Sequence, residues 1–298
     1  VVEAKLANAP IGVPFSITAG IDGNYGYGVN NVAISYGIAL EKGQTHQFTT
    51  AQVLNIGDPL RIYASPNLSA IDLSGFTEYM STLNVGGVYT ETLGTQLKSL
   101  TLGVDSTTDS RRNTALKEIS GLNNCKRLEM LNIEGYQGIT SIDMSQLNYL
   151  KTLKAKKTGL TSISLPDGSP IEHLELSSSI QGLVLSNANN LTINNLKFES
   201  GWVNLSSITI KRCKHLTNNW SLINDWYKNK YAQDSKCSLV MEGVLWNDVL
   251  PEDVISLGNI KLSGGNLSLK GTIRMVSVTG EQIMTIKSIY GEYVFVKG

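Results

Sequence analysis

The sequence predicts a mainly β fold with some α, a solenoid of short stacked strands with a β cap at its N-terminal end and a strand–helix cap at its C-terminal end. The first observation is a six-residue pattern, apolar-x-x-apolar-x-apolar, that returns along the middle of the chain. The second is a composition with only 17% charged residues and 28 glycines in 298 residues, which indicates many short strands and tight turns. The third is a change to alternating strands and helices after residue 216.

The apolar pattern occurs nine times, and between Leu128 and Ile180 it returns every 9 to 11 residues. Residues i and i+2 of a strand share a face, so Leu131 and Ile133 are expected to point into one core. A single strand cannot bury that face alone, and stacking on the next coil would bury it. The nine copies begin at Leu68, Leu97, Leu128, Ile139, Leu150, Leu160, Ile171, Ile180 and Leu205.

Two stretches carry a resemblance to a known family. They are NIEGYQGITSIDMSQLNYLKTLKAKKTGLTSISL and the following PDGSPIEHLELSSS. Both resemble bacterial leucine-rich repeats with a nested half-repeat, in which steps of 10 and 11 residues combine to a period of about 21. The resemblance extends over roughly residues 58–212 and is to repeats of the kind found in gut Bacteroidetes and their phages. It implies a leucine-rich-repeat solenoid and a surface that binds proteins or glycans.

Three parts are expected: a β cap over 1–57, the solenoid over 58–216, and strand–helix repeats or a cap over 217–298. In the first part, VAISYGIAL, EKGQ and THQFTT predict a β-hairpin. The preceding GIDGNYGYGVNN predicts an irregular loop, which either packs into the cap or forms an aromatic contact surface.

The C-terminal part is expected to continue the solenoid, although a separate small α/β domain is an alternative. A helix is predicted from Trp220, capped by Asn218 or Asn219, and another after the cap residue Thr279. A short helix is predicted for LPEDVISLG, and strands are predicted for CSLVMEG, IKLSG, GTIRMVSV and EYVFVKG.

No catalytic constellation, metal site or cofactor is predicted. The histidines lie far apart in the sequence, and the three cysteines are too few for a disulfide framework. No nucleophile elbow or phosphate-binding glycine loop occurs. An enzyme hidden in the C-terminal part near His215 remains a residual alternative. The three histidines are His46, His173 and His215, and the three cysteines are Cys125, Cys213 and Cys237.

Charge and hydropathy argue against binding to nucleic acid through bulk charge and against a membrane span. The 25 basic and 25 acidic residues give no net charge, which argues against a nucleic-acid binder that acts through bulk charge. No apolar run is long enough for a membrane span.

The chain begins at Val1 without a signal-peptide pattern, so we expect a piece of a longer protein. We expect that protein to be extracellular, on a bacterial cell surface or in a virion.

The predicted ligand face consists of the outward positions of successive strands. The lysine cluster around Lys154 is read either as a solvated strand edge or as a contact for an acidic partner or anionic glycan, partly neutralised by Glu134 and Glu175. The four tryptophans, Trp202, Trp220, Trp226 and Trp246, are read as core anchors or as a sugar platform. The predicted binding residues are Met130, Asn132, Glu134, Thr152, Lys154, Lys156, His173 and Glu175.

The sequence therefore predicts a non-catalytic recognition scaffold that presents a strand face to a protein or glycan ligand. The alternative is a structural spacer in a larger secreted or virion assembly.

Overall fold

The computed structural model describes residues 2–64, 68–86, 96–104, 110–217, 220–291 and 294–297. This part of the chain is mainly β, with three α-helices. It divides into two compact units, which are described separately. The first comprises Val1–Thr161 with His173–Ser179, and the second Ser162–Glu172 with Ile180–Gly298. The boundaries predicted at residues 57 and 216 stay predictions.

One sheet of the first unit is almost entirely antiparallel. Its six strands lie in the order β10-β8-β1-β6-β3-β4, and only the β10–β8 pair is parallel. The strands are β1 (Val2–Leu6), β3 (Gly23–Val29), β4 (Val32–Leu40), β6 (Asp58–Ala64), β8 (Met80–Asn84) and β10 (Ile119–Ser120).

The β3–β4 hairpin corrects two predictions. Asn30 and Asn31 join the strands with φ angles of 50° and 64°, the left-handed backbone of a type I′ turn. The glycine- and tyrosine-rich segment is therefore a buried strand and not an irregular loop, with Tyr25 and Tyr27 in the core. The predicted hairpin of Val32–Leu40 with residues 45–50 is also wrong, because its two halves lie in different sheets.

The other sheet of the first unit mixes strand directions. The strands that belong to the first unit lie in the order β14-β12-β11-β9-β7-β2-β5. β2 is antiparallel to both of its neighbours, whereas β7, β9, β11, β12 and β14 are mutually parallel. The strands are β2 (Pro14–Ala19), β5 (Thr45–Thr49), β7 (Leu68–Asp72), β9 (Ser99–Thr101), β11 (Met130–Asn132), β12 (Thr152–Ala155) and β14 (His173–Leu176).

Aromatic side chains fill the N-terminal core between the two sheets. Phe15 stacks on Phe48 at a centroid distance of 5.1 Å, and both belong to the mixed sheet. Tyr27 of the antiparallel sheet meets the Phe15 ring edge-on at 5.0 Å. Phe76, in the short 3₁₀ helix η1 (Ser74–Phe76), packs against Phe15 at 5.6 Å. Such aromatic pairs stabilise the fold by more than the burial of their apolar surface alone.

The prediction of a leucine-rich-repeat solenoid with a separate β cap is wrong, because both sheets of the first unit combine strands of the predicted cap with strands of the predicted repeats. Residues 58–84 were expected to form the first repeats, but they supply β6, β7 and β8, which pair antiparallel with β1, β2 and β3. The apolar spacing determines which side chains turn inward. It does not determine strand direction or partner, because parallel and antiparallel neighbours bury the same alternating positions.

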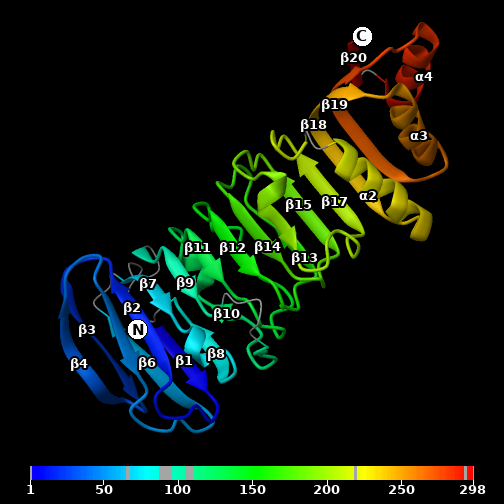
Figure 1. Ribbon diagram of the computed structural model, residues 1–298. Helices are drawn as coiled ribbons and strands as arrows, with labels where there is room; N and C mark the ends of the chain where they lie inside the picture. The colour runs from blue at the N-terminus through cyan, green and yellow to red at the C-terminus, as the bar shows by residue number, and fades with distance from the viewer. Residues whose placement is uncertain are drawn as a thin grey trace. The chain divides into compact units, whose positions relative to one another are not determined.

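The second unit contains a parallel sheet and the three helices. The sheet order β13-β15-β17-β18-β19-β20 follows the chain, which places successive crossovers on one side. Figure 1 shows α2, α3 and α4 along that side of β18 and β19. The strands are β13 (Ser162–Ser164), β15 (Gly182–Ser186), β17 (Ser207–Lys211), β18 (Ser238–Val249), β19 (Asn266–Met275) and β20 (Val294–Lys297), with β16 (Leu196–Phe198) outside this sheet.

The three C-terminal helices agree with the sequence and one strand does not. The helix α2 (Trp220–Gln233) is confirmed, while its predicted caps Asn218 and Asn219 lie outside the described residues. The helix α4 (Gly280–Tyr290) begins at a capping box formed by Thr279 and Gln282. The short helix predicted for LPEDVISLG is confirmed as part of α3 (Pro251–Leu262). The strand predicted for IKLSG is wrong, because α3 extends to Leu262 and includes its first three residues. Two further 3₁₀ helices are η2 (Leu122–Asn124) and η3 (Ile193–Asn195).

Candidate functional site

The predicted ligand face lies on β11, β12 and β14 of the first unit, and β9 extends it. The parallel register places Met130 beside Thr152 and Thr152 beside His173. The same register places Asn132 beside Lys154 and Lys154 beside Glu175. Six of the eight predicted residues therefore form two rows across the strands.

The eight residues differ in how far solvent reaches them. His173 is exposed, and Met130, Thr152, Lys154, Lys156 and Glu175 are half-buried. Asn132 and Glu134 are buried, with only 3% and 5% of their surface exposed. These two side chains therefore do not face solvent as the strand pattern suggests.

Asn132 and Glu134 have local surroundings that explain their burial. The Asn132 amide donates to the Gly103 carbonyl at 3.1 Å, and its side-chain oxygen accepts the Glu134 backbone N–H at 3.0 Å. Asn132 thus stabilises the turn that ends β11. Glu134 lines a small hollow together with the basic residues Arg111, Arg112 and Lys157.

Glutamates neutralise much of the lysine cluster. Glu129 makes ion pairs with Lys98 at 3.0 Å and with Lys151 at 2.9 Å. Hydrogen bonds from Lys151 and Lys98 lower the pKa of Glu129. Lys156 makes an ion pair with Glu175 on the neighbouring strand. The face is therefore amphoteric and not a uniformly positive patch, which disfavours a polyanionic ligand held by bulk charge.

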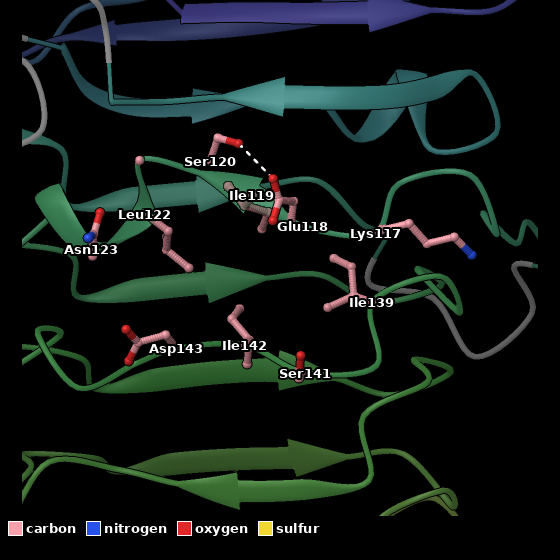
Figure 2. A pocket seen from close by; sticks show the side chains of 11 residues that line it. Lys117, Glu118, Ile119, Ser120, Leu122, Asn123, Ile139, Ser141, Ile142 and Asp143 are labelled. Carbon is pink, nitrogen blue, oxygen red and sulfur yellow. Dashed lines mark hydrogen bonds between the residues drawn. The ribbon is translucent and has the colours of Figure 1, made fainter.

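A groove of about 500 Å³ lies beside β10, at the edge of the antiparallel sheet. Figure 2 shows Ile119 and Ser120 on one side of it and Ser141 and Ile142 on the other. Ile119 and Ile142 are both half-buried. The sequence reasoning did not predict this groove, because Ile142 was assigned to a buried strand.

The polar groups of this groove form local structure. The Ser120 hydroxyl donates to the Glu118 carboxylate at 3.2 Å (Figure 2). The Ser145 backbone N–H lowers the pKa of Asp143, whose carboxylate is therefore ionised at neutral pH. These contacts describe a polar surface groove, and they do not couple a nucleophile to a base.

The cysteine thiols are buried and protonated. Burial raises the pKa of Cys125 to about 12 and also raises the pKa of Cys213 and Cys237. A thiol with a raised pKa is a poor nucleophile and a poor metal ligand. Among the residues that the structure describes, no group of three or more His, Cys, Asp or Glu side chains is placed to hold a metal ion.

The four tryptophans divide into two pairs in the second unit. Trp246 is buried, donates to the Thr217 carbonyl and packs against Trp220 at a ring distance of 4.4 Å. This pair serves as a core anchor. Trp226 and Trp202 instead line a second groove, between α2 and the segment around residue 202.

No family model, curated protein or solved structure matches this chain. None of the helices that the structure describes has the length and apolar character needed to cross a membrane.

Proposed function

We propose that this chain is a non-catalytic recognition scaffold that presents the outer face of β9, β11, β12 and β14 to a protein or glycan ligand. We further propose that it acts outside the cell, on a bacterial surface or in a virion. The observation that carries the proposal is the lateral register of the side chains on these four strands.

The register gives the face a fixed geometry. Ser99, Met130, Thr152 and His173 occupy equivalent positions on successive strands. At a strand spacing of about 4.8 Å, this row spans about 14 Å. The backbone of this face is already ordered in strands, so binding has to order only the side chains, which favours recognition. The row combines a hydroxyl, a thioether, a second hydroxyl and an imidazole, and it suits a polar ligand of mixed character.

The amphoteric charge of the face supports the choice of ligand class. Lys156 is paired with Glu175, and Lys98 and Lys151 share Glu129. Alternating charges favour a partner with complementary charges of both signs and contribute mainly to specificity and association rate. A folded protein surface has this character, and so do glycans with few charges.

The test is a glycan and protein array probed with the purified chain and with a Lys154→Glu/Lys156→Glu variant. We expect the variant to bind its array target at least tenfold more weakly, and the wild-type interaction to weaken as salt rises. The matched control is Lys42→Glu/Lys126→Glu, which makes the same charge change at exposed positions off this face. Equal binding by both variants, with no dependence on salt, would refute the strand face as the binding site.

A structural role is the second candidate, and the edge strand β4 favours it. None of the nine residues VAISYGIAL is charged, and Tyr36 is 74% exposed. Uncharged edge strands pair readily with other strands, and most proteins protect them. Sedimentation of the wild type and of Tyr36→Lys tests this role. Concentration-dependent association that the lysine abolishes would support it, and two monomeric proteins would exclude pairing through β4.

A further inference from the structure

We propose that the groove between α2 and residues 201–203 in the second unit binds a neutral saccharide. The groove has a volume of about 480 Å³, within the usual range for small-ligand sites. It lies within one compact unit, and the proposal does not depend on the strand face of the first unit.

The groove is held open by contacts that are already formed. Trp226 on α2 donates its indole N–H to the Trp202 carbonyl at 3.0 Å. One turn further along α2, Lys230 donates to the Val203 carbonyl at 3.2 Å. These two bonds attach the opposite wall to the helix by its backbone. A preformed site loses less conformational entropy on binding than one that must fold around its ligand.

One part of the lining is apolar and partly open to solvent. Leu222 is 40% exposed and Val203 is 57% exposed. The Trp202 ring is half-buried and is held at 5.5 Å from Phe198 in an edge-on arrangement. An indole offers a flat apolar surface. The C–H face of a pyranose ring is the apolar surface of similar size that would cover it while leaving the hydroxyl groups directed to the sides.

The other part of the lining is a polar stripe on α2. Asp225, Asn229 and Gln233 follow one another at intervals of four residues, so they lie along one side of the helix. In the described part of the chain their side chains make no hydrogen bond to other protein groups. A carboxylate accepts hydrogen bonds, and an amide both donates and accepts them. This set complements vicinal hydroxyl groups.

The charge of the stripe selects a neutral ligand. Asp225 contributes a negative charge, whereas the Lys230 ammonium already donates to the Val203 carbonyl. Asp225 offsets the positive charge of Lys230, so a phosphorylated or acidic sugar would meet no net positive charge in the groove. An apolar peptide side chain would leave the three polar groups of the stripe without complementary partners, so it fits the groove less well.

The experiment is a printed array of neutral oligosaccharides, followed by calorimetric titration of the whole chain with the sugar that binds best. We expect Trp202→Ala to weaken binding at least tenfold and Trp202→Phe to retain part of it. Asn229→Ala and Gln233→Ala change exposed side chains and leave the core intact, and each is expected to weaken binding severalfold. Sugar binding should also shift the tryptophan fluorescence, and Trp202→Phe should reduce that shift.

Two controls distinguish this site from the strand face. Leu262→Ala removes a side chain that is 69% exposed outside the groove and should bind sugar as the wild type does. The Lys154→Glu/Lys156→Glu variant should also bind sugar normally, even if it no longer binds the ligand of the strand face. Absence of binding to every neutral sugar, or binding unaffected by the Trp202, Asn229 and Gln233 variants, would overturn the proposal. Capture of apolar peptides in place of sugars would also overturn it.

Discussion

The two units of this chain provide hydrogen-bond partners for their buried backbone N–H and C=O groups in different ways. In the first unit, β9, β11, β12 and β14 are three or four residues long, and the segments between them over residues 110–161 are largely irregular. In the second unit, β18 has 12 residues and β19 has 10, and the helices α2, α3 and α4 connect the strands from β17 to β20. A helix satisfies most of its own backbone, whereas an irregular buried segment requires partners from elsewhere.

Polar side chains supply those partners in the first unit. Asn113 alone bonds four backbone groups, and Asn132, Ser177 and Ser179 make similar contacts at other turns. In the second unit, buried aromatic residues such as Trp246 instead hold the helices and strands together. The first unit should therefore be most sensitive to the loss of single polar groups, and the second to the loss of buried volume and helix caps.

The largest effect is expected for Asn113→Ala. The Asn113 amide donates to the Thr77 and Met80 carbonyls at 2.8 and 2.7 Å, and its oxygen accepts from the N–H groups of Ala115 and Leu116 at 2.9 and 2.8 Å. Alanine leaves all four backbone groups without these hydrogen bonds. Each loss costs about 1–3 kcal/mol, and the four losses are not fully additive. We expect the free energy of unfolding to fall by about 4 kcal/mol in urea titrations.

The matched control for this change is Asn148→Ala in the same unit. Asn148 is exposed and makes no side-chain hydrogen bond within the described residues. Its loss should change the free energy of unfolding by no more than about 0.5 kcal/mol. Similar values for the two alanine variants would contradict the view that single amides maintain the turns of the first unit.

The corresponding change in the second unit is Trp246→Phe. The indole N–H of Trp246 donates to the Thr217 carbonyl, and its ring packs on Trp220 at 4.4 Å. Phenylalanine keeps an aromatic ring but loses this hydrogen bond and part of the volume. We expect a loss of about 2 kcal/mol, measured by urea unfolding. Leu262→Ala, at a position that is 69% exposed, provides the control and should have little effect. A loss for Trp246→Phe as small as the control's would show that this pair is not an anchor.

A smaller effect is expected for Thr279→Ala at the start of α4. The Thr279 hydroxyl accepts the Gln282 backbone N–H at 3.2 Å, and the Gln282 side chain accepts the Thr279 backbone N–H at 2.9 Å. Removing such a cap usually costs about 1 kcal/mol. Thermal melting followed by circular dichroism should show this loss for Thr279→Ala and a smaller one for Thr279→Ser, which keeps the hydroxyl. Equal losses for the two variants would argue against the cap.

The sequence predicted inward-facing positions better than it predicted strand partners. Leu131, Leu153 and Leu174 are buried and adjacent in register, as the spacing of apolar residues indicated. Ile163 instead pairs with Leu183 in another sheet, and Ile142 is half-buried and lies outside the described strands. Alternation reports which side of a strand is covered, whereas direction and partner depend on long-range pairing that no local pattern encodes.

The candidate sites also depend on long-range contacts that a local sequence pattern does not encode. Asn132 and Glu134 occupy outward positions by pattern, yet the neighbouring turn covers both. Asn113 was missed because an asparagine in an irregular segment resembles any loop residue until its partners Thr77 and Met80 are known. The stripe that contains Asp225 was missed because polar residues spaced along a helix usually mark a solvated face.

The smallest expected effect on the free energy of unfolding is that of Glu129→Gln, which removes two ion pairs in the first unit. Glu129 is paired with Lys98 and Lys151, and these contacts lower its pKa in the folded state. A lowered folded-state pKa stabilises the protein above the ordinary pKa of glutamate, and this contribution disappears as the pH falls through the folded-state value. Because the side chain is 32% exposed, solvent screens the pairs, and we expect a loss of only about 0.5 kcal/mol at pH 7.

The pH dependence distinguishes this electrostatic contribution from packing. The difference between wild type and Glu129→Gln in urea unfolding at pH 7 should shrink as the pH falls, and it should vanish at a pH below the lowered folded-state pKa, where the carboxyl group is protonated in both states. Glu41→Gln, at an exposed position of the same unit, should show little difference at either pH. A Glu129→Gln loss that persisted at low pH would mean that shape and hydrogen bonding hold this row of side chains. In that case the strand face would, like the turns around Asn113, depend on neutral polar contacts.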